Sequence, residues 1–194
     1  MMKFDVVVIG GGWAGRTVAD RLAGAGLRVC VVSEGLSLAA VHDESPYSCL
    51  AGLQKKGVTV LRGDRALQGM ADADKVTGLV TRNLGPDTML EAGAFVLATG
   101  KFFSRGLLSD MNHIWEPVFG ADVAYDADRT KWADPEFSSH QPFMDFGVRT
   151  DEAGHVLVSG RPVMNLYAAG EILAAGSKEF DTDSFIEEYE HRIG

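Results

Sequence analysis

The sequence predicts an α/β fold with a central parallel sheet, a small antiparallel β-meander and an irregular, aromatic-rich insertion. An apolar strand, a glycine turn and a helix follow one another within residues 4–35. Short strands alternate with polar turns at 58–90, a pattern typical of a meander. Apolar stretches at 95–98 and 165–169 have the composition of strands buried on both faces.

Composition indicates a globular protein. The chain has 194 residues, of which 46% are hydrophobic and 23% charged, so we expect a single domain over 1–194. A net charge of −9 without a cluster of basic residues argues against nucleic acid as a partner. No apolar run reaches the roughly 20 residues that a bilayer-spanning helix needs, and the first residues make a poor signal peptide. We therefore expect a cytoplasmic protein that does not insert directly into a membrane.

The two cysteines indicate neither a redox pair nor a metal site. Cys30 falls in a predicted strand and Cys49 in a predicted loop, with no Cys-x-x-Cys pair and no metal-ligand spacing of His and Cys. We therefore predict no bound metal.

The first 35 residues read as a complete βαβ unit. Residues 4–9 are an apolar strand, and Ala14, Val18 and Leu22 then recur at the spacing of one helical face. Gly24 and Gly26 are expected to end the helix, and 27–32 reads as a second, β-branched strand.

The middle of the chain has weaker signals. Residues 38–57 read as a connector, with one or two helical turns near 50–56. Three short strands are expected to form the meander, and a separate buried strand completes this part of the chain (58–100). These strands are expected at Val58–Leu61, Val76–Arg82, Thr88–Leu90 and Phe95–Ala98.

After residue 100 the pattern is first irregular and then regular again. The insertion at 101–146 is rich in aromatic residues and interrupted by prolines. Residues 147–176 are expected to hold a hairpin around the turn 151–154 and a last core strand at 165–169. A final helix is expected to start near Ser184, which has capping-box spacing to Glu187.

The glycine turn carries the first functional signal. Gly10, Gly12 and Gly15 lie between a strand and a helix, where such glycines allow a sharp turn, close approach of a pyrophosphate and tight helix packing. Trp13 and Ala14 begin the helix, whose first N–H groups suit an anion. A purely structural turn produces this motif about as often as a cofactor site does.

An acidic residue after the second strand makes the motif more specific. Glu34, next to Gly35, is placed to accept hydrogen bonds from an adenosine ribose, although it could also be a solvated strand-end acid. The pattern favours a dinucleotide with a free 2′-hydroxyl over NADP, because the carboxylate would repel a 2′-phosphate. This βαβ unit alone leaves NAD and FAD open.

Two later turns favour a flavin. Ala98-Thr99-Gly100 and Gly170-Glu171 each follow an apolar strand and supply small residues, as close approach to a flat or extended ligand requires. Either could be an ordinary strand-to-loop turn, but together with the glycine motif they favour FAD. FMN is disfavoured, since it has no adenosine ribose to meet Glu34.

These pieces resemble a known superfamily, the FAD-dependent oxidoreductases of glutathione reductase and fumarate reductase type. In that superfamily an N-terminal glycine motif, a strand ending in Ala-Thr-Gly and a late strand ending in Gly-Asp or Gly-Glu surround one FAD. The resemblance implies a Rossmann-like FAD-binding fold and a main-chain contact to adenine near Ala66.

A closer resemblance includes the irregular insertion. The stretches 98–107, 116–123, 141–143 and 146–152 look like the family of the B subunit of anaerobic glycerol-3-phosphate dehydrogenase, and the similarity covers about 1–35 and 94–176. Members are flavin-linked components of a three-part, membrane-associated complex, in which one companion subunit oxidises glycerol 3-phosphate and the other carries iron–sulfur clusters. The chain is shorter than that family between Glu34 and Phe95, where substrate-side material is expected.

The resemblance implies an FAD-binding oxidoreductase subunit that transfers electrons within a multi-subunit dehydrogenase. Its partners would be other dehydrogenase subunits or a second copy, and any membrane contact would be peripheral, at the inner face and through partners. The alternative is a catalytically silent assembly module that retains the fold; an NAD-dependent dehydrogenase ranks third.

No catalytic residue is assigned from the sequence. The acid–base or anion-binding candidates of the insertion are each better explained as surface or packing residues: Lys101, Arg105, His113 and His140. Three aromatic residues could cover a flavin ring or simply fill the core: Phe102, Phe103 and Trp115.

Overall fold

A computed structural model describes residues 2–35 and 52–193 of the chain. The first half contains the elements β1 (Met2–Ile9), α1 (Trp13–Gly24), β2 (Val29–Ser33), β3 (Thr59–Arg62), β4 (Arg65–Asp72), β5 (Lys75–Arg82) and β6 (Thr88–Leu97). The second half contains β7 (Leu108–Ser109), β8 (Ile114–Trp115), β9 (Val123–Ala124), β10 (Gly147–Val148), β11 (His155–Val158), β12 (Arg161–Ala168) and α3 (Thr182–Ile193), with short 3₁₀ turns at Arg129–Lys131, Pro142–Met144 and Gly170–Ile172.

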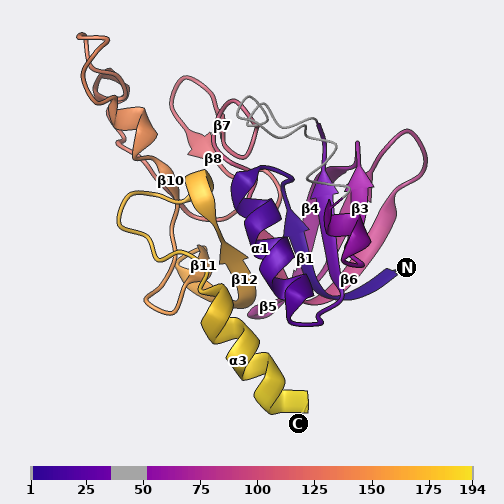
Figure 1. Ribbon diagram of the computed structural model, residues 1–194. Coiled ribbons are helices and arrows are strands. Elements are labelled where there is room, and N and C mark those ends of the chain that lie inside the picture. The colour runs from indigo at the N-terminus through magenta and orange to yellow at the C-terminus, as the bar shows by residue number, and fades with distance from the viewer. Residues whose placement is uncertain (1, 36–51, 194) are drawn as a thin grey trace.

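The centre of the molecule is a parallel sheet in the order β3-β2-β1-β6-β12, with β11 added antiparallel at one edge (Figure 1). This order matches one half of a doubly wound dinucleotide-binding sheet extended by two strands. The predicted α/β fold class is confirmed. Parallel strands align their carboxyl ends along one edge of the sheet, and the expected ligand-facing turns follow those ends.

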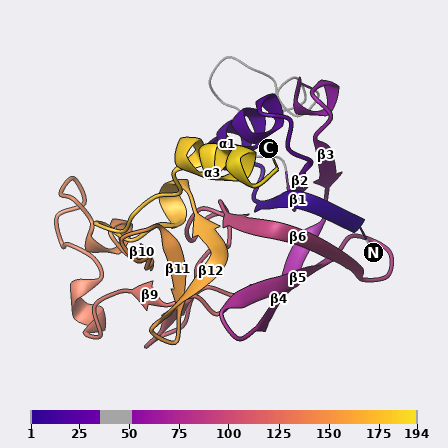
Figure 2. The ribbon, with the colours of Figure 1, turned by 90° about the horizontal axis from the view of Figure 1, so that it is seen from below.

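The sheet separates two layers of core. On one face, residues such as Val6, Val8 and Val31 pack against α1 and α3. On the other face, residues such as Val7 and Phe95 pack against the meander and the insertion. Figure 2 shows α1 and α3 together on one side of β1 and β6, with β4 and β5 away from these helices. Successive side chains of a strand point to opposite faces of the sheet, so the central strands contribute residues to both core layers.

The meander contains one strand that was not predicted and lacks one that was. Strands β4, β5 and β6 form it, whereas β3 pairs in parallel with β2 and belongs to the central sheet. The sequence-based prediction omitted β4, because exposed and half-buried residues dominate this edge strand and give it little alternation. The expected strands at 88–90 and 95–98 are also one strand, β6, which pairs with β5 at its start and with β1 along nearly its whole length.

The end of the chain departs from two further expectations. The cap of α3 is Asp181, whose carboxylate accepts the main-chain N–H and the hydroxyl of Ser184, so Ser184 lies inside the first turn. The expected capping box was wrong because an acidic residue three positions earlier makes the cap. The turn at 151–154 does form, but β10 pairs with β9, and the main partner of β11 is β12.

The insertion is irregular, as predicted, and it docks on the meander. The Gly69 N–H of β4 donates to the Val118 carbonyl at 2.8 Å. The ring of Phe119 lies so close to Gly69 that a β-carbon there would be 2.0 Å from it. The part after β9 projects away from the sheet (Figure 1). Of the two cysteines, Cys30 is a buried core residue whose burial raises its thiol pKa to about 12, and Cys49 lies outside the described residues.

Candidate functional site

Two glycines of the N-terminal turn are required by the packing of the protein itself. A β-carbon at Gly10 would lie 2.1 Å from the Ala98 carbonyl oxygen, and the backbone φ of Gly10 is +117°. A β-carbon at Gly15 would lie 2.0 Å from the Gly10 carbonyl oxygen, because α1 packs directly on the turn. Packing within the protein therefore accounts for the first and third glycines of the motif without any ligand.

Gly12 is different, because no atom of the described residues lies within 4 Å of the place where its β-carbon would be. It is the N-cap of α1, and the first helical bond runs from the Arg16 N–H to the Gly12 carbonyl at 3.0 Å. The N–H groups of residues 13–15 have no acceptor among the described residues, and the first turn contains no acidic side chain. The open space and the free donors together fit an anion at the helix N-terminus.

The predicted turns meet at the carboxyl edge of the sheet. The Ala98 N–H donates to the Ile9 carbonyl, and the Ala169 N–H donates to the Leu97 carbonyl, each at 2.8 Å. The structure therefore places Ala98-Thr99-Gly100 between the glycine turn on one side and Gly170-Glu171 on the other. Adjacent ends of β1, β6 and β12 surround one region, as a ligand lying across the sheet edge requires.

The central turn carries an unpaired hydroxyl. The side-chain oxygen of Thr99 is buried and has no hydrogen-bond partner among the described residues. The turn 101–106 covers it closely, since a β-carbon at Gly106 would be 2.6 Å from that oxygen. A buried polar atom without a partner in the protein is uncommon, so this turn is a place where packing leaves a hydroxyl unsatisfied.

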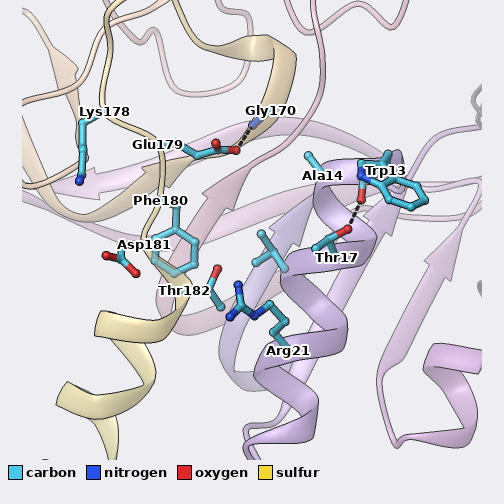
Figure 3. Close-up of a pocket in the computed structure, with 11 residues that line it drawn as sticks. Trp13, Ala14, Thr17, Arg21, Gly170, Lys178, Glu179, Phe180, Asp181 and Thr182 are labelled. Atoms are coloured by element: carbon cyan, nitrogen blue, oxygen red, sulfur yellow. Dashed lines mark hydrogen bonds between the residues drawn. The ribbon is translucent and has the colours of Figure 1, made fainter.

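The last turn is partly occupied by the protein's own carboxylate. The Gly170 N–H donates to Glu179 at 2.8 Å, and a β-carbon at Gly170 would be 2.5 Å from the Ala14 β-carbon. Figure 3 shows the Glu179 carboxylate directed toward Gly170, across from the start of α1. The main-chain donor of Gly170 is therefore used internally, while the Glu171 side chain is exposed.

A cavity of about 480 Å³ lies between α1 and the segment that leads into α3 (Figure 3). Among the predicted site residues only Trp13, Ala14 and Gly170 line it, and Trp13 is 74% exposed at its edge. Arg21 and Asp183, joined by an ion pair, connect α1 with α3 near this cavity. The cavity lies on the side of α1 that faces Gly170 and residues 178–182, and Gly12 is not among the residues that line it.

Glu34 lies beside two arginines that are distant from it in sequence. Its carboxylate lies 3.6 Å from Nη1 of Arg105 and 3.9 Å from Nε of Arg65. The three residues come from the end of β2, the start of β4 and the turn after β6. Gly35 follows Glu34 and accepts a hydrogen bond from Ser33, and Ala66 lies within β4, which pairs only with β5 and leaves its other edge without a partner strand in the described sheet.

Of the four acid–base or anion-binding candidates in the insertion, only Lys101 is partly buried beside the proposed site. Its ammonium group donates to the Met144 carbonyl. Burial lowers the pKa of Lys101, and the charges of Asp145 and Glu171 oppose that shift. Both histidine candidates form pairs at the surface: His140 with Asp145 at 2.8 Å, and His113 with Asp110 at 3.5 Å.

The three aromatic candidates do not form one lid. Phe102 packs edge-on against Phe143 with ring centroids 6.2 Å apart. Phe103 is fully exposed, and Trp115 lies at the surface in β8. Of the three, only Phe102 packs against the core, where it is half-buried, and the structure does not bring the set together over one ring.

Sequence reasoning missed Glu116, the principal buried acid. Its carboxylate accepts the N–H groups of Val118, Phe119 and Ala121, and so fixes the loop that docks on the meander. Burial raises the pKa of Glu116, while the main-chain N–H groups oppose the shift. The sequence feature that could have revealed it is an acidic residue in an apolar stretch, directly before Pro117. Its role is structural, and no group of three potential metal ligands occurs among the described residues.

The FAD binding domain family matches residues 37–182 of this chain. The chain belongs to that family. The prediction of FAD as the cofactor is confirmed at the level of the family. The match begins after the glycine turn, so the geometry at Gly10–Gly15 is evidence independent of it.

Curated relatives are named as the B subunit of anaerobic glycerol-3-phosphate dehydrogenase. One from Vibrio vulnificus (strain YJ016) is 38% identical over 130 residues, which are 66% of this chain and 30% of the relative. One from Aliivibrio fischeri (strain ES114) is 40% identical over 61% of this chain and 28% of its own. The predicted family resemblance is confirmed, and the chain spans less than a third of these relatives.

Among solved structures, the FAD-dependent halogenase CndH of a myxobacterium aligns with a TM-score of 0.44 and 21% identity, over 52% of this chain and 38% of that one. None of the described helices has the length and apolar character needed to cross a membrane.

Proposed function

We propose that this chain is an FAD-binding electron-transfer component of a multi-subunit dehydrogenase. The observation that carries the proposal is the open space at Gly12 beside the free N–H groups at the start of α1. Two of the three glycines are explained by packing, whereas the described residues leave open space at the third, where a ligand would fit. Family membership identifies that ligand as FAD.

Most of the predicted site residues have a role in this proposal. The N–H groups of Trp13, Ala14 and Gly15 would donate to the pyrophosphate, and Glu34 would accept the ribose hydroxyls. The Ala98-Thr99-Gly100 and Gly170-Glu171 turns would hold the middle of the dinucleotide, with Glu171 accepting ribityl hydroxyls. The exposed edge of β4 at Ala66 would meet the adenine. When bound, FAD supplies the hydride and electron chemistry.

The proposed partners are inferred from the curated relatives. Because the curated relatives are subunits of a dehydrogenase, we propose that this chain acts with partner subunits, at the inner face of the membrane through those partners. The partly buried Lys101, whose charge interacts with that of Glu171, is a cation that we expect beside the bound flavin. We assign no catalytic residue.

The test is the ligand that the purified chain carries. The protein is denatured, and the released small molecules are identified by mass spectrometry; apoprotein is then titrated with FAD, FMN and NAD. Stoichiometric FAD, or tighter binding of FAD than of FMN and NAD, supports the proposal. Bound NAD without flavin contradicts it. Failure to bind FAD at micromolar concentration, together with binding of a dehydrogenase subunit, would favour the silent assembly module.

A further inference from the structure

Arg105 reaches across the edge of the sheet to Glu34. Arg105 belongs to the turn after β6, and Glu34 follows β2; both strands are neighbours of β1 but not of each other. Neighbouring strands lie about 4.8 Å apart, so the ends of β6 and β2 are separated by roughly 10 Å. The 3.6 Å ion pair therefore bridges the carboxyl end of β1, where the turn of Gly10 and Gly12 begins.

The backbone holds Arg105 in an unfavourable conformation. Its φ is +61°, in the left-handed region. The Gly106 N–H donates to the Lys101 carbonyl, and the Arg105 N–H donates to the Phe102 carbonyl. This pair of bonds is the Schellman pattern that ends a helical turn, and Arg105 occupies the position at which glycine is usual.

The other non-glycine residues with positive φ have a structural reason. Ala73 lies in the tight turn between β4 and β5, and Ser159 lies in the turn between β11 and β12. Hairpin turns of two residues need left-handed backbone. Arg105 joins no paired strands, so hairpin geometry does not account for an arginine there.

The fold gains little from the Arg105 side chain. The side chain is 63% exposed, and its partner Glu34 is 45% exposed. Exposed ion pairs stabilise proteins weakly. A conformational cost without a compensating gain in stability points to a role in binding.

We propose that Arg105 is a phosphate-binding strap across the glycine turn. This inference rests on the proposed function. In the structure the guanidinium pairs with Glu34. When ribose hydroxyls occupy Glu34, the guanidinium donates to the diphosphate from the side opposite the N–H groups of α1. Arg65 stays beside Glu34 and keeps that carboxylate in place. A planar guanidinium suits this task, since it donates two parallel hydrogen bonds to phosphate oxygens.

The test compares Arg105→Gly with two controls in the full chain. Ser159→Gly relieves a left-handed backbone elsewhere without removing a cation, and Arg28→Gln removes an exposed, paired arginine at the opposite end of β2. For each variant the melting temperature is measured, as is the Kd of the apoprotein for FAD at low and high salt. ADP and adenosine are tested as competitors.

The strap predicts opposite effects on stability and binding. Arg105→Gly should melt at or above the wild-type temperature and bind FAD and ADP about tenfold more weakly, with a smaller salt dependence and unchanged competition by adenosine. Arg105→Lys should recover part of the affinity. Ser159→Gly and Arg28→Gln should bind FAD like the wild type.

Three results would overturn the inference. If Arg105→Gly binds FAD as tightly as the wild type, FAD binding stands and the strap does not exist. If the variant loses melting temperature and affinity together, Arg105 is a structural residue. If the wild-type chain binds no FAD, the proposed function fails, and the strap fails with it.

Discussion

Asn165 forms two hydrogen bonds with the main chain of Val76. Its side-chain oxygen accepts the Val76 N–H at 2.7 Å, and its amide group donates to the Val76 carbonyl at 2.9 Å. Asn165 lies on β12 and Val76 on β5, so one side chain takes the place of a strand partner between the parallel sheet and the meander. The same amide also donates to the Gly93 carbonyl of β6.

Replacing Asn165 by alanine should destabilise the protein by about 2 kcal/mol, because the buried Val76 N–H and carbonyl lose their partners. The free energy of unfolding from urea titration measures this. Asn112→Ala, in an exposed loop, should change it by less than about 0.5 kcal/mol. Equal losses in both variants would show that the Asn165 bonds do not support the meander.

Gly12→Ala and Gly10→Ala should separate binding from folding. Gly12→Ala has space for its methyl group, so its free energy of unfolding should stay within about 1 kcal/mol of the wild type, while its FAD affinity falls about tenfold or more. Gly10→Ala should lose at least about 3 kcal/mol, since its methyl group meets the Ala98 carbonyl. Unchanged FAD affinity in Gly12→Ala would place the pyrophosphate elsewhere.

Glu116→Ala should destabilise the protein by about 3 kcal/mol, because three N–H groups of the docked loop lose their acceptor. Urea titration again measures the effect, with the exposed Glu152→Ala as the matched control. A loss below about 1 kcal/mol would mean that water replaces the carboxylate and that the loop is not held by it.

Removing Arg28 should change how stability depends on acid. The hydrogen bonds from Arg28 hold the pKa of Asp5 below its usual value of 3.8. A lowered folded-state pKa stabilises the protein above the unfolded pKa, and this contribution is lost as the pH falls through the folded value. The stability difference between wild type and Arg28→Gln should therefore be constant from neutral pH to about pH 5 and shrink below pH 4. Arg161→Gln, at the exposed start of β12, should show no such narrowing.

The elements with strong local patterns could be predicted from the sequence. The βαβ unit was predicted correctly because its strands are almost wholly apolar and Gly24 and Gly26 end the helix where expected. The two halves of β6 were separated because Glu91 and Gly93 interrupt the apolar run. Pairing with β1 along one edge holds that stretch as a strand, and pairing is a long-range property.

The site was predictable as a set of turns but not as a set of contacts. Gly12 and Glu34 are recognisable from their spacing alone. The approach of Arg65 and Arg105 to Glu34 depends on strand order, which brings residues distant in sequence to one edge. Glu179, which binds the Gly170 N–H, follows a turn whose path has no periodic signal.

The continuity of strand β6 affects the local opening that allows amide hydrogens to exchange. Its start forms part of the meander, and its end leads into the Ala-Thr-Gly turn, without a break between them. The two parts of the strand share one continuous ladder of hydrogen bonds to β1, so we expect their amide hydrogens to exchange together there. The amides of Phe95, Val96 and Leu97 should belong to the slowest-exchanging group in the molecule, and loosening the meander should make the edge proposed to face the cofactor exchange faster as well.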